Sequence, residues 1–263
     1  MGEGSGPGLL VVLPLGPALI GIGITVLLAA AAVWSGSFTA WAGVVAALFA
    51  SLIVVILGWP YFALLVLFVV ASVLATRYGF EEKLRKNVHE GSHGERGISN
   101  VLAHVLIPAG LALASLAVPG ALASGALAVL FTSALAFGSA DTFASEFGVL
   151  SGRARSILSG RPVAPGTNGG VSGIGEVWAV VGALGTGIIG TLFFLAAQLP
   201  SLPTALLVGG ASVAGFLGCQ VDSLLGETLE NRGLLTKGST NLLAMLASVG
   251  FGLLFLLASH IPL

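Results

Sequence analysis

Long apolar runs separated by short polar connections dominate the chain, and this pattern predicts membrane-spanning helices. A helix needs about 20 predominantly apolar residues to cross a bilayer. The runs here are continuously apolar and rich in Ala, Leu and Gly, which favours helices over strands. Eight spans follow, at about 10–33, 38–58, 60–77, 98–117, 121–147, 174–198, 203–229 and 239–260. We therefore predict an all-α, polytopic transmembrane helix bundle.

Composition supports the same fold class. Hydrophobic residues make up 56% of the chain and charged residues only 8%, whereas a soluble domain carries roughly 25% charged residues. Most of the surface must therefore contact membrane lipids, and the net charge of -1 predicts no nucleic-acid partner. We treat residues 1–263 as a single integral membrane domain, in which 1–76 form apolar N-terminal helices and 77–263 carry the catalytic helices and cytoplasmic loops.

The positions of the basic residues predict the orientation in the membrane. All of them fall in the third, fifth and seventh connections between spans, which share one side. The positive-inside rule makes that side cytoplasmic, so both termini are expected outside. These residues are Arg77, Lys83, Arg85, Lys86, Arg96, Arg153, Arg155, Arg161, Arg232 and Lys237.

Two acidic motifs lie inside otherwise apolar spans. Each has small residues, then an aspartate (Asp141 or Asp222), then a hydroxyl residue, and a glutamate five residues after the aspartate (Glu146 or Glu227). Both spans run inward, so we interpret the motifs as a parallel internal repeat whose helices pair at a common site. A carboxylate inside a span is costly unless it is paired or binds a cation, and therefore indicates function. The alternative is that each aspartate only bonds a polar side chain on a neighbouring helix.

Carboxylate and hydroxyl oxygens suit Mg²⁺, which proteins usually hold with a few carboxylates plus substrate phosphates. The candidate catalytic residues are Asp141, Glu146, Asp222 and Glu227. The candidate metal ligands are Asp141, Glu146, Asp222 and Ser223.

A glycine-rich connection between the two motifs is a candidate anion site. Its glycines let backbone N–H groups converge, and the positive end of the next helix faces it. Arg161 adds a cation suited to phosphate. Lys237 either reaches a phosphate or only marks the cytoplasmic boundary, and Glu176 is interpreted as complementing the dipole of its helix. The candidate phosphate and nucleotide residues are Arg161, Gly166, Thr167, Asn168, Gly169, Gly170, Ser172, Lys237 and Asn241.

At these motifs the chain resembles a known family. Segments 140–148, 166–172 and 222–226 are similar, in order, to three signatures of the integral membrane family that includes plant phytyl-phosphate kinase and vertebrate transmembrane protein nineteen. The resemblance covers about residues 95–245. It implies a membrane kinase that converts a prenyl monophosphate of phytyl or geranylgeranyl type to the diphosphate, with CTP or another nucleoside triphosphate as donor and Mg²⁺ as cofactor.

Three other readings stay open. A cytidylyltransferase would use the same metal and substrates but attack the α-phosphate of CTP. An ion-coupled transporter would use the buried acids for its coupling ion, although these acids cluster near one face. A non-catalytic scaffold leaves the buried acids unexplained. The pattern gives no prenyl chain length and no oligomeric state.

Overall fold

The computed structural model describes residues 14–89, 91, 94–117, 124–199 and 204–259. Within them, eight helices are long and apolar enough to cross a membrane, which confirms the predicted fold class. The predicted span ends at 10–13, 121–123, 203 and 260 lie outside the described residues. The helices are α1 (Leu15–Trp34), α2 (Ala40–Leu57), α3 (Trp59–Arg77), α5 (Ile98–Ala117), α6 (Ser124–Gly148), α7 (Gly173–Ala196), α8 (Ala211–Leu225) and α9 (Lys237–Ala258).

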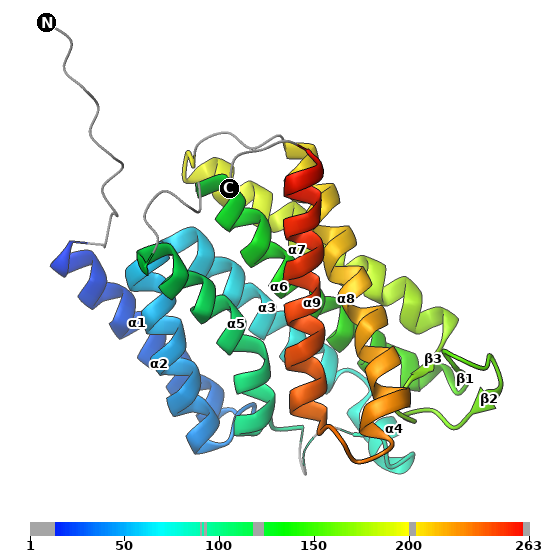
Figure 1. Cartoon of the computed structure of the whole chain (residues 1–263). Helices are drawn as coiled ribbons and strands as arrows, with labels where there is room; N and C mark the ends of the chain where they lie inside the picture. The colour runs from blue at the N-terminus through cyan, green and yellow to red at the C-terminus, as the bar shows by residue number, and fades with distance from the viewer. Residues whose placement is uncertain (1–13, 90, 92–93, 118–123, 200–203, 260–263) are drawn as a thin grey trace, which may run out of the picture.

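Helix α6 forms the centre of the bundle (Figure 1). The share of its spanning window that is buried is 94%, whereas the corresponding share for α1 is 17%. Helices α3, α5, α7, α8 and α9 all pack against α6, while α1 packs mainly on α2 at the edge. The acidic motif of α6 is therefore carried by the most enclosed helix, and α1 exposes most of its surface to lipid.

Glycines allow α7 and α8 to approach α6 closely. A Cβ atom on Gly182 of α7 would lie 2.6 Å from the carbonyl oxygen of Ser139. A Cβ atom on Gly215 of α8 would lie 2.6 Å from the carbonyl carbon of Ala136. Small residues at helix contacts are the usual means of close packing in lipid, where the hydrophobic effect between helices is weak.

The odd-numbered connections meet at one end of the bundle. The first and third connections join where Thr39 N donates to Arg96 O at 3.1 Å and Arg96 N donates to Ser37 O at 2.9 Å. Gly166 of the fifth connection faces Val88 of the third. The structure therefore brings the basic connections together, and we call this the cation-rich end; α9 begins there at Lys237 and runs to the opposite end of the bundle (Figure 1). Which side of the membrane the cation-rich end faces stays a prediction.

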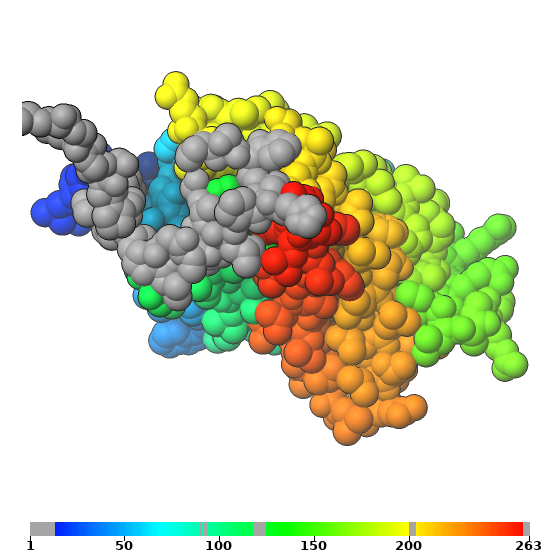
Figure 2. All heavy atoms as spheres, turned by 45° about the horizontal axis from the view of Figure 1, so that its top comes forward, coloured from blue at the N-terminus to red at the C-terminus, as the bar shows by residue number. Residues whose placement is uncertain are grey.

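The connections also contain short elements. Helix α4 (Phe80–Arg85) follows α3, and the 3₁₀ turn η1 (Val149–Ser151) follows α6. The fifth connection folds into an antiparallel sheet of order β2-β1-β3, with β1 (Ala154–Ser156), β2 (Pro162–Val163) and β3 (Gly170–Val171). Figure 2 shows this segment protruding from the helical body on the side away from α1. The sheet was not predicted, because strands of two or three residues carry no readable alternation.

Candidate functional site

A pocket of about 180 Å³ opens at the cation-rich end, among α6, α7, α8, α9 and the loop before α7. We call it the acidic pocket. It collects most of the residues that the sequence singled out, although they come from distant parts of the chain. The predicted residues that line it are Asp141, Gly166, Thr167, Asn168, Gly169, Gly170, Ser172, Asp222, Ser223 and Lys237.

The two aspartates meet in this pocket. Asp141 of α6 is 8% exposed and Asp222 of α8 is 6% exposed. Lys237 Nζ donates to Asp222 Oδ2 at 2.8 Å, and Asn241 Nδ2 lies 3.5 Å from Asp141 Oδ2. Lys237 and Asn241 are four residues apart on α9, so one face of that helix contacts both carboxylates. Asn241 does not line the pocket itself but reaches it through Asp141.

The glycine-rich loop is held against α8. Gly169 has a φ of +74°, which glycine adopts without strain. A Cβ atom on Gly169 would lie 2.8 Å from Ser223 O and would collide with Glu227 Cβ. At the end of the loop, Ser172 Oγ accepts a hydrogen bond from Gly175 N at 3.0 Å and caps α7. The loop and the positive end of α7 therefore both border the acidic pocket.

The glutamates of the two motifs do not reach the acidic pocket. Five residues along a helix amount to a rotation of about 140° from the aspartate, which directs the glutamate to another face. Glu227 accepts hydrogen bonds from Ser156 Oγ at 2.5 Å and Leu158 N at 3.2 Å, and so fixes the sheet segment to the end of α8. The structure thus gives Glu227 a structural contact rather than the catalytic position that the repeat suggested.

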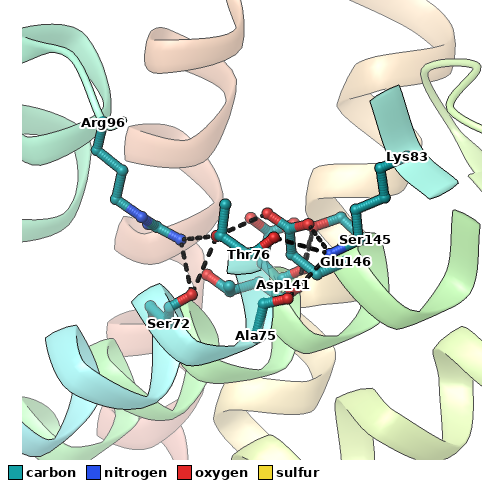
Figure 3. Close-up of polar contacts among 9 residues, drawn as sticks. Ser72, Ala75, Thr76, Lys83, Arg96, Asp141, Ser145 and Glu146 are labelled. Carbon is teal, nitrogen blue, oxygen red and sulfur yellow. Dashed lines mark hydrogen bonds and ion pairs between the residues drawn. The ribbon is translucent and has the colours of Figure 1, made fainter. Parts of the chain in front are cut away.

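Glu146 lies in a separate buried network (Figure 3). Lys83 Nζ donates to Glu146 Oε2 at 2.7 Å, and Thr76 Oγ1 donates to Glu146 Oε1 at 2.8 Å. Arg96 Nη2 donates to Thr76 Oγ1 at 3.1 Å. The side chain of Lys83 is 0% exposed, so Glu146 is its buried counter-ion. With its charge already compensated, Glu146 is not placed as a ligand of a metal in the acidic pocket.

Arg161 also lies outside the acidic pocket. Its carbonyl oxygen accepts a hydrogen bond from Ser156 N at 2.9 Å within the sheet segment, and its side chain is exposed. The cation that lines the pocket is Lys237.

Sequence reasoning missed Glu176 and Ser145 as pocket residues. Glu176 lies in the first turn of α7, as expected for a residue that complements the helix dipole. Its Oε2 also accepts a hydrogen bond from Gln220 Nε2 at 3.0 Å. The position of Glu176 in the sequence could have identified it. Because α7 starts directly after the glycine-rich loop, an acidic residue in its first turn lies near the group that the loop binds.

The donor set restricts the kind of metal that fits. Asp222 Oδ1 is buried without a hydrogen-bond partner, so one carboxylate oxygen is available. Among the described residues, no group of three or more His, Cys, Asp or Glu side chains forms a metal cage. These donors fit Mg²⁺, which keeps several waters and binds through one or two carboxylates plus substrate phosphates. His89 does not add to the site, because it packs on Phe80; His93 lies outside the described residues.

Fold and site together define a polytopic α-helical membrane protein with a buried acidic pocket at one end of its bundle. The model of the family "Integral membrane protein DUF92" matches residues 23–251, and the chain belongs to that family. The chain is 34% identical over 198 residues to the uncharacterized membrane protein MJ0933 of Methanocaldococcus jannaschii, covering 75% of this chain and 76% of that protein. It is 30% identical over 191 residues to protein PGR of Arabidopsis thaliana, covering 67% and 66% respectively. No solved structure matches the chain.

Proposed function

We propose that the protein is a membrane phosphotransferase that converts a prenyl monophosphate to the diphosphate, with CTP as the donor and Mg²⁺ as the cofactor. One observation carries the proposal: two buried aspartates from parallel helices meet in a pocket that a glycine-rich loop and a helix N-terminus also border. The class of lipid and the donor come from the resemblance of these motifs to the prenyl-phosphate kinase family.

The charges in the acidic pocket support a metal-dependent reaction. Three carboxylates, those of Asp141, Asp222 and Glu176, line the pocket together with one ammonium group, that of Lys237. A bare nucleoside triphosphate would be repelled by this excess of negative charge, whereas the same nucleotide with Mg²⁺ would be attracted. When bound, Mg²⁺ would supply charge neutralisation across the donor phosphates.

The residues of the chain have separate tasks in this proposal. Asp141 and Asp222 would hold the metal, and on Asp222 the binding atom would be Oδ1, which has no hydrogen-bond partner. The side chain of Lys237 is 56% exposed while that of Asp222 is 8% exposed, so Lys237 can leave the carboxylate and contact a phosphate oxygen. The glycine-rich loop and the first turn of α7 would bind phosphate oxygens through backbone N–H groups.

No strong general base is needed on the acceptor. The acceptor oxygen belongs to a lipid phosphate that is already ionised near neutral pH, so it attacks the γ-phosphorus without losing a proton first. The bond between the γ-phosphorus and the β–γ bridging oxygen breaks, and CDP leaves with that electron pair. Catalysis then depends on positioning and charge stabilisation, which are the contributions that phosphoryl transfer requires.

Product analysis tests the proposed function. The purified protein is incubated with Mg²⁺, geranylgeranyl monophosphate and either CTP or ATP, labelled at the α- or the γ-phosphate. We expect the γ-label to move to the lipid and CDP to appear. Release of pyrophosphate with the α-label on the lipid would assign a cytidylyltransferase instead. Transfer of neither label, in protein that remains folded, would contradict both enzymes.

A further inference from the structure

A second and larger cavity lies on the other part of the bundle. Its volume is about 470 Å³ and its walls belong to α1, α2, α3 and α5, none of which lines the acidic pocket. We call it the apolar groove. Helices α3 and α5 both pack on α6 but make few close contacts with each other, and α2 covers the space between them. Small residues keep that space open, including Ala46 and Ala50 on α2 and Ala29 and Ala32 on α1.

One end of the apolar groove is polar. Ser72, Arg77, Arg96, Asn100 and His104 line it there, at the cation-rich end, whereas most of the remaining lining is aliphatic or aromatic. Arg77 donates to Ser35 O at 2.6 Å and Ser37 Oγ at 3.0 Å, and no carboxylate of the described residues lies within ion-pair distance of it. The groove is therefore complementary to an amphiphile that has an anionic head and an apolar chain.

Two buried polar atoms at this end have no protein partner. His104 is 3% exposed and Ser72 is 1% exposed. His104 Nδ1 contacts Asn100 O at 2.8 Å, but its Nε2 has no hydrogen-bond partner, and neither does Ser72 Oγ. Buried polar atoms are normally satisfied. Ser72 on α3 and His104 on α5 line the same end of one cavity, so a polar ligand group bound there would lie beside both residues.

The polar end of the groove adjoins the acidic motif of α6. A Cβ atom on Gly138 would lie 3.1 Å from His104 Cδ2, and Gly138 precedes Asp141 by about 4.5 Å along the helix axis. Arg96 is connected to the same helix through Thr76, which donates to Glu146 at 2.8 Å (Figure 3). A phosphate at this end would thus approach the helix that carries Asp141.

We propose that the apolar groove binds the chain of the isoprenoid monophosphate acceptor, with its phosphate held near Arg77, Arg96 and His104. This assignment rests on the proposed function. A single-chain lipid is favoured over a bilayer phospholipid because the volume of the groove is in the range of sites that take one small molecule. The groove gives the nearly charge-free first third of the chain a role in substrate selection.

Filling the groove tests the proposal by its dependence on chain length. Ala50→Phe adds a ring to the groove floor, and Val44→Phe adds the same ring to the outer face of α2, where Val44 is 57% exposed. Binding of geranylgeranyl monophosphate and the shorter geranyl monophosphate is measured on purified full-length protein, with melting temperature as the control for folding. We expect Ala50→Phe to weaken binding of the longer lipid by about tenfold or more, because the added ring leaves less of the long chain buried in the groove. Binding of the shorter lipid should change much less. Val44→Phe should change the binding of neither lipid.

Equal losses for both lengths, or none for either, would overturn the groove as the chain site. Competition by phosphatidate as strong as that by geranylgeranyl monophosphate would also overturn it, since the groove would then bind bilayer lipid. Length-dependent binding without any phosphate transfer would support the groove while refuting the kinase, so the two failures are distinguishable.

The head of the lipid is tested separately. Arg77→Gln removes a cation from the polar end, and Arg85→Gln removes an exposed cation of α4 that does not line the groove. Arg77→Gln should weaken the binding of geranylgeranyl monophosphate by about tenfold, because one charged contact to the phosphate is lost. It should leave the binding of geranylgeraniol, which has no phosphate, unchanged. Arg77→Lys should recover part of the affinity. Equal weakening of the phosphate and the alcohol would overturn the placement of the head.

Discussion

At the scale of single residues, the position of a carboxylate on its helix decides whether it contacts the acidic pocket. Asp141 and Asp222 could be identified from sequence because a charge inside an apolar span is costly and therefore stands out. The contacts of Glu146 and Glu227 could not be identified from sequence, because their partners lie in other connections. Lys83 and Ser156 are separated from these glutamates by 63 and 71 residues along the chain.

The buried pair Lys83–Glu146 gives the first prediction. Lys83→Met leaves the Glu146 carboxylate, whose side chain is 10% exposed, without its counter-ion. Breaking one partner of a buried pair costs about 3–5 kcal/mol, so we expect a strongly lowered free energy of unfolding. Denaturant titration in detergent measures it.

The matched control is Lys86→Met, which breaks an exposed pair with Glu82 whose side chains are 35% and 46% exposed. It should cost at most about 1 kcal/mol. Lys83→Met/Glu146→Leu should recover much of the lost stability, because no unpaired charge remains. Equal effects of Lys83→Met and Lys86→Met would show that the buried network does not stabilise the fold.

At the scale of elements, the spans could be predicted within a few residues, since apolar length alone defines them. The short sheet and the π-helical turn η3 (Gly226–Glu230) could not, because tertiary contacts rather than local periodicity specify them. Turn η3 begins four residues after Asp222 and carries Glu227. Turns of this type often occur at functional sites, and here the turn joins the acidic pocket to the sheet segment.

The close approach of α7 to α6 gives the second prediction. Gly182→Val places a side chain against Ser139 O, where even a Cβ atom would lie at 2.6 Å. Overpacking of this kind costs about 1–3 kcal/mol, and the displaced α7 should also reduce activity. Gly185→Val on the same helix is the control, because nothing lies within 4 Å of its Cβ position. Melting temperatures that fall equally in both variants would contradict close packing at Gly182.

At the scale of the whole molecule, sidedness gives the third prediction. Leu158 is an exposed residue of the sheet segment at the cation-rich end, and Thr204 is an exposed residue near the start of the last-but-one span. Cys219 is buried and should not interfere. By the positive-inside rule, Leu158→Cys should react with an impermeant thiol reagent only after cells are opened, whereas Thr204→Cys should react in intact cells. The reverse pattern would place the acidic pocket outside.

In the proposed reaction the two aspartates hold one metal ion and act as one unit, and Mg²⁺-dependent turnover per folded molecule tests this most directly. Asp141→Asn, Asp222→Asn and the double variant keep the shape of the side chains but remove the charge. We expect all three to fold, because an amide is less costly to bury than a charge without its cation. Each single variant should lose turnover by orders of magnitude, and the double variant should be little worse than either single, since residues that act together are non-additive. Normal Mg²⁺-dependent turnover in either folded single variant would contradict the proposed metal site.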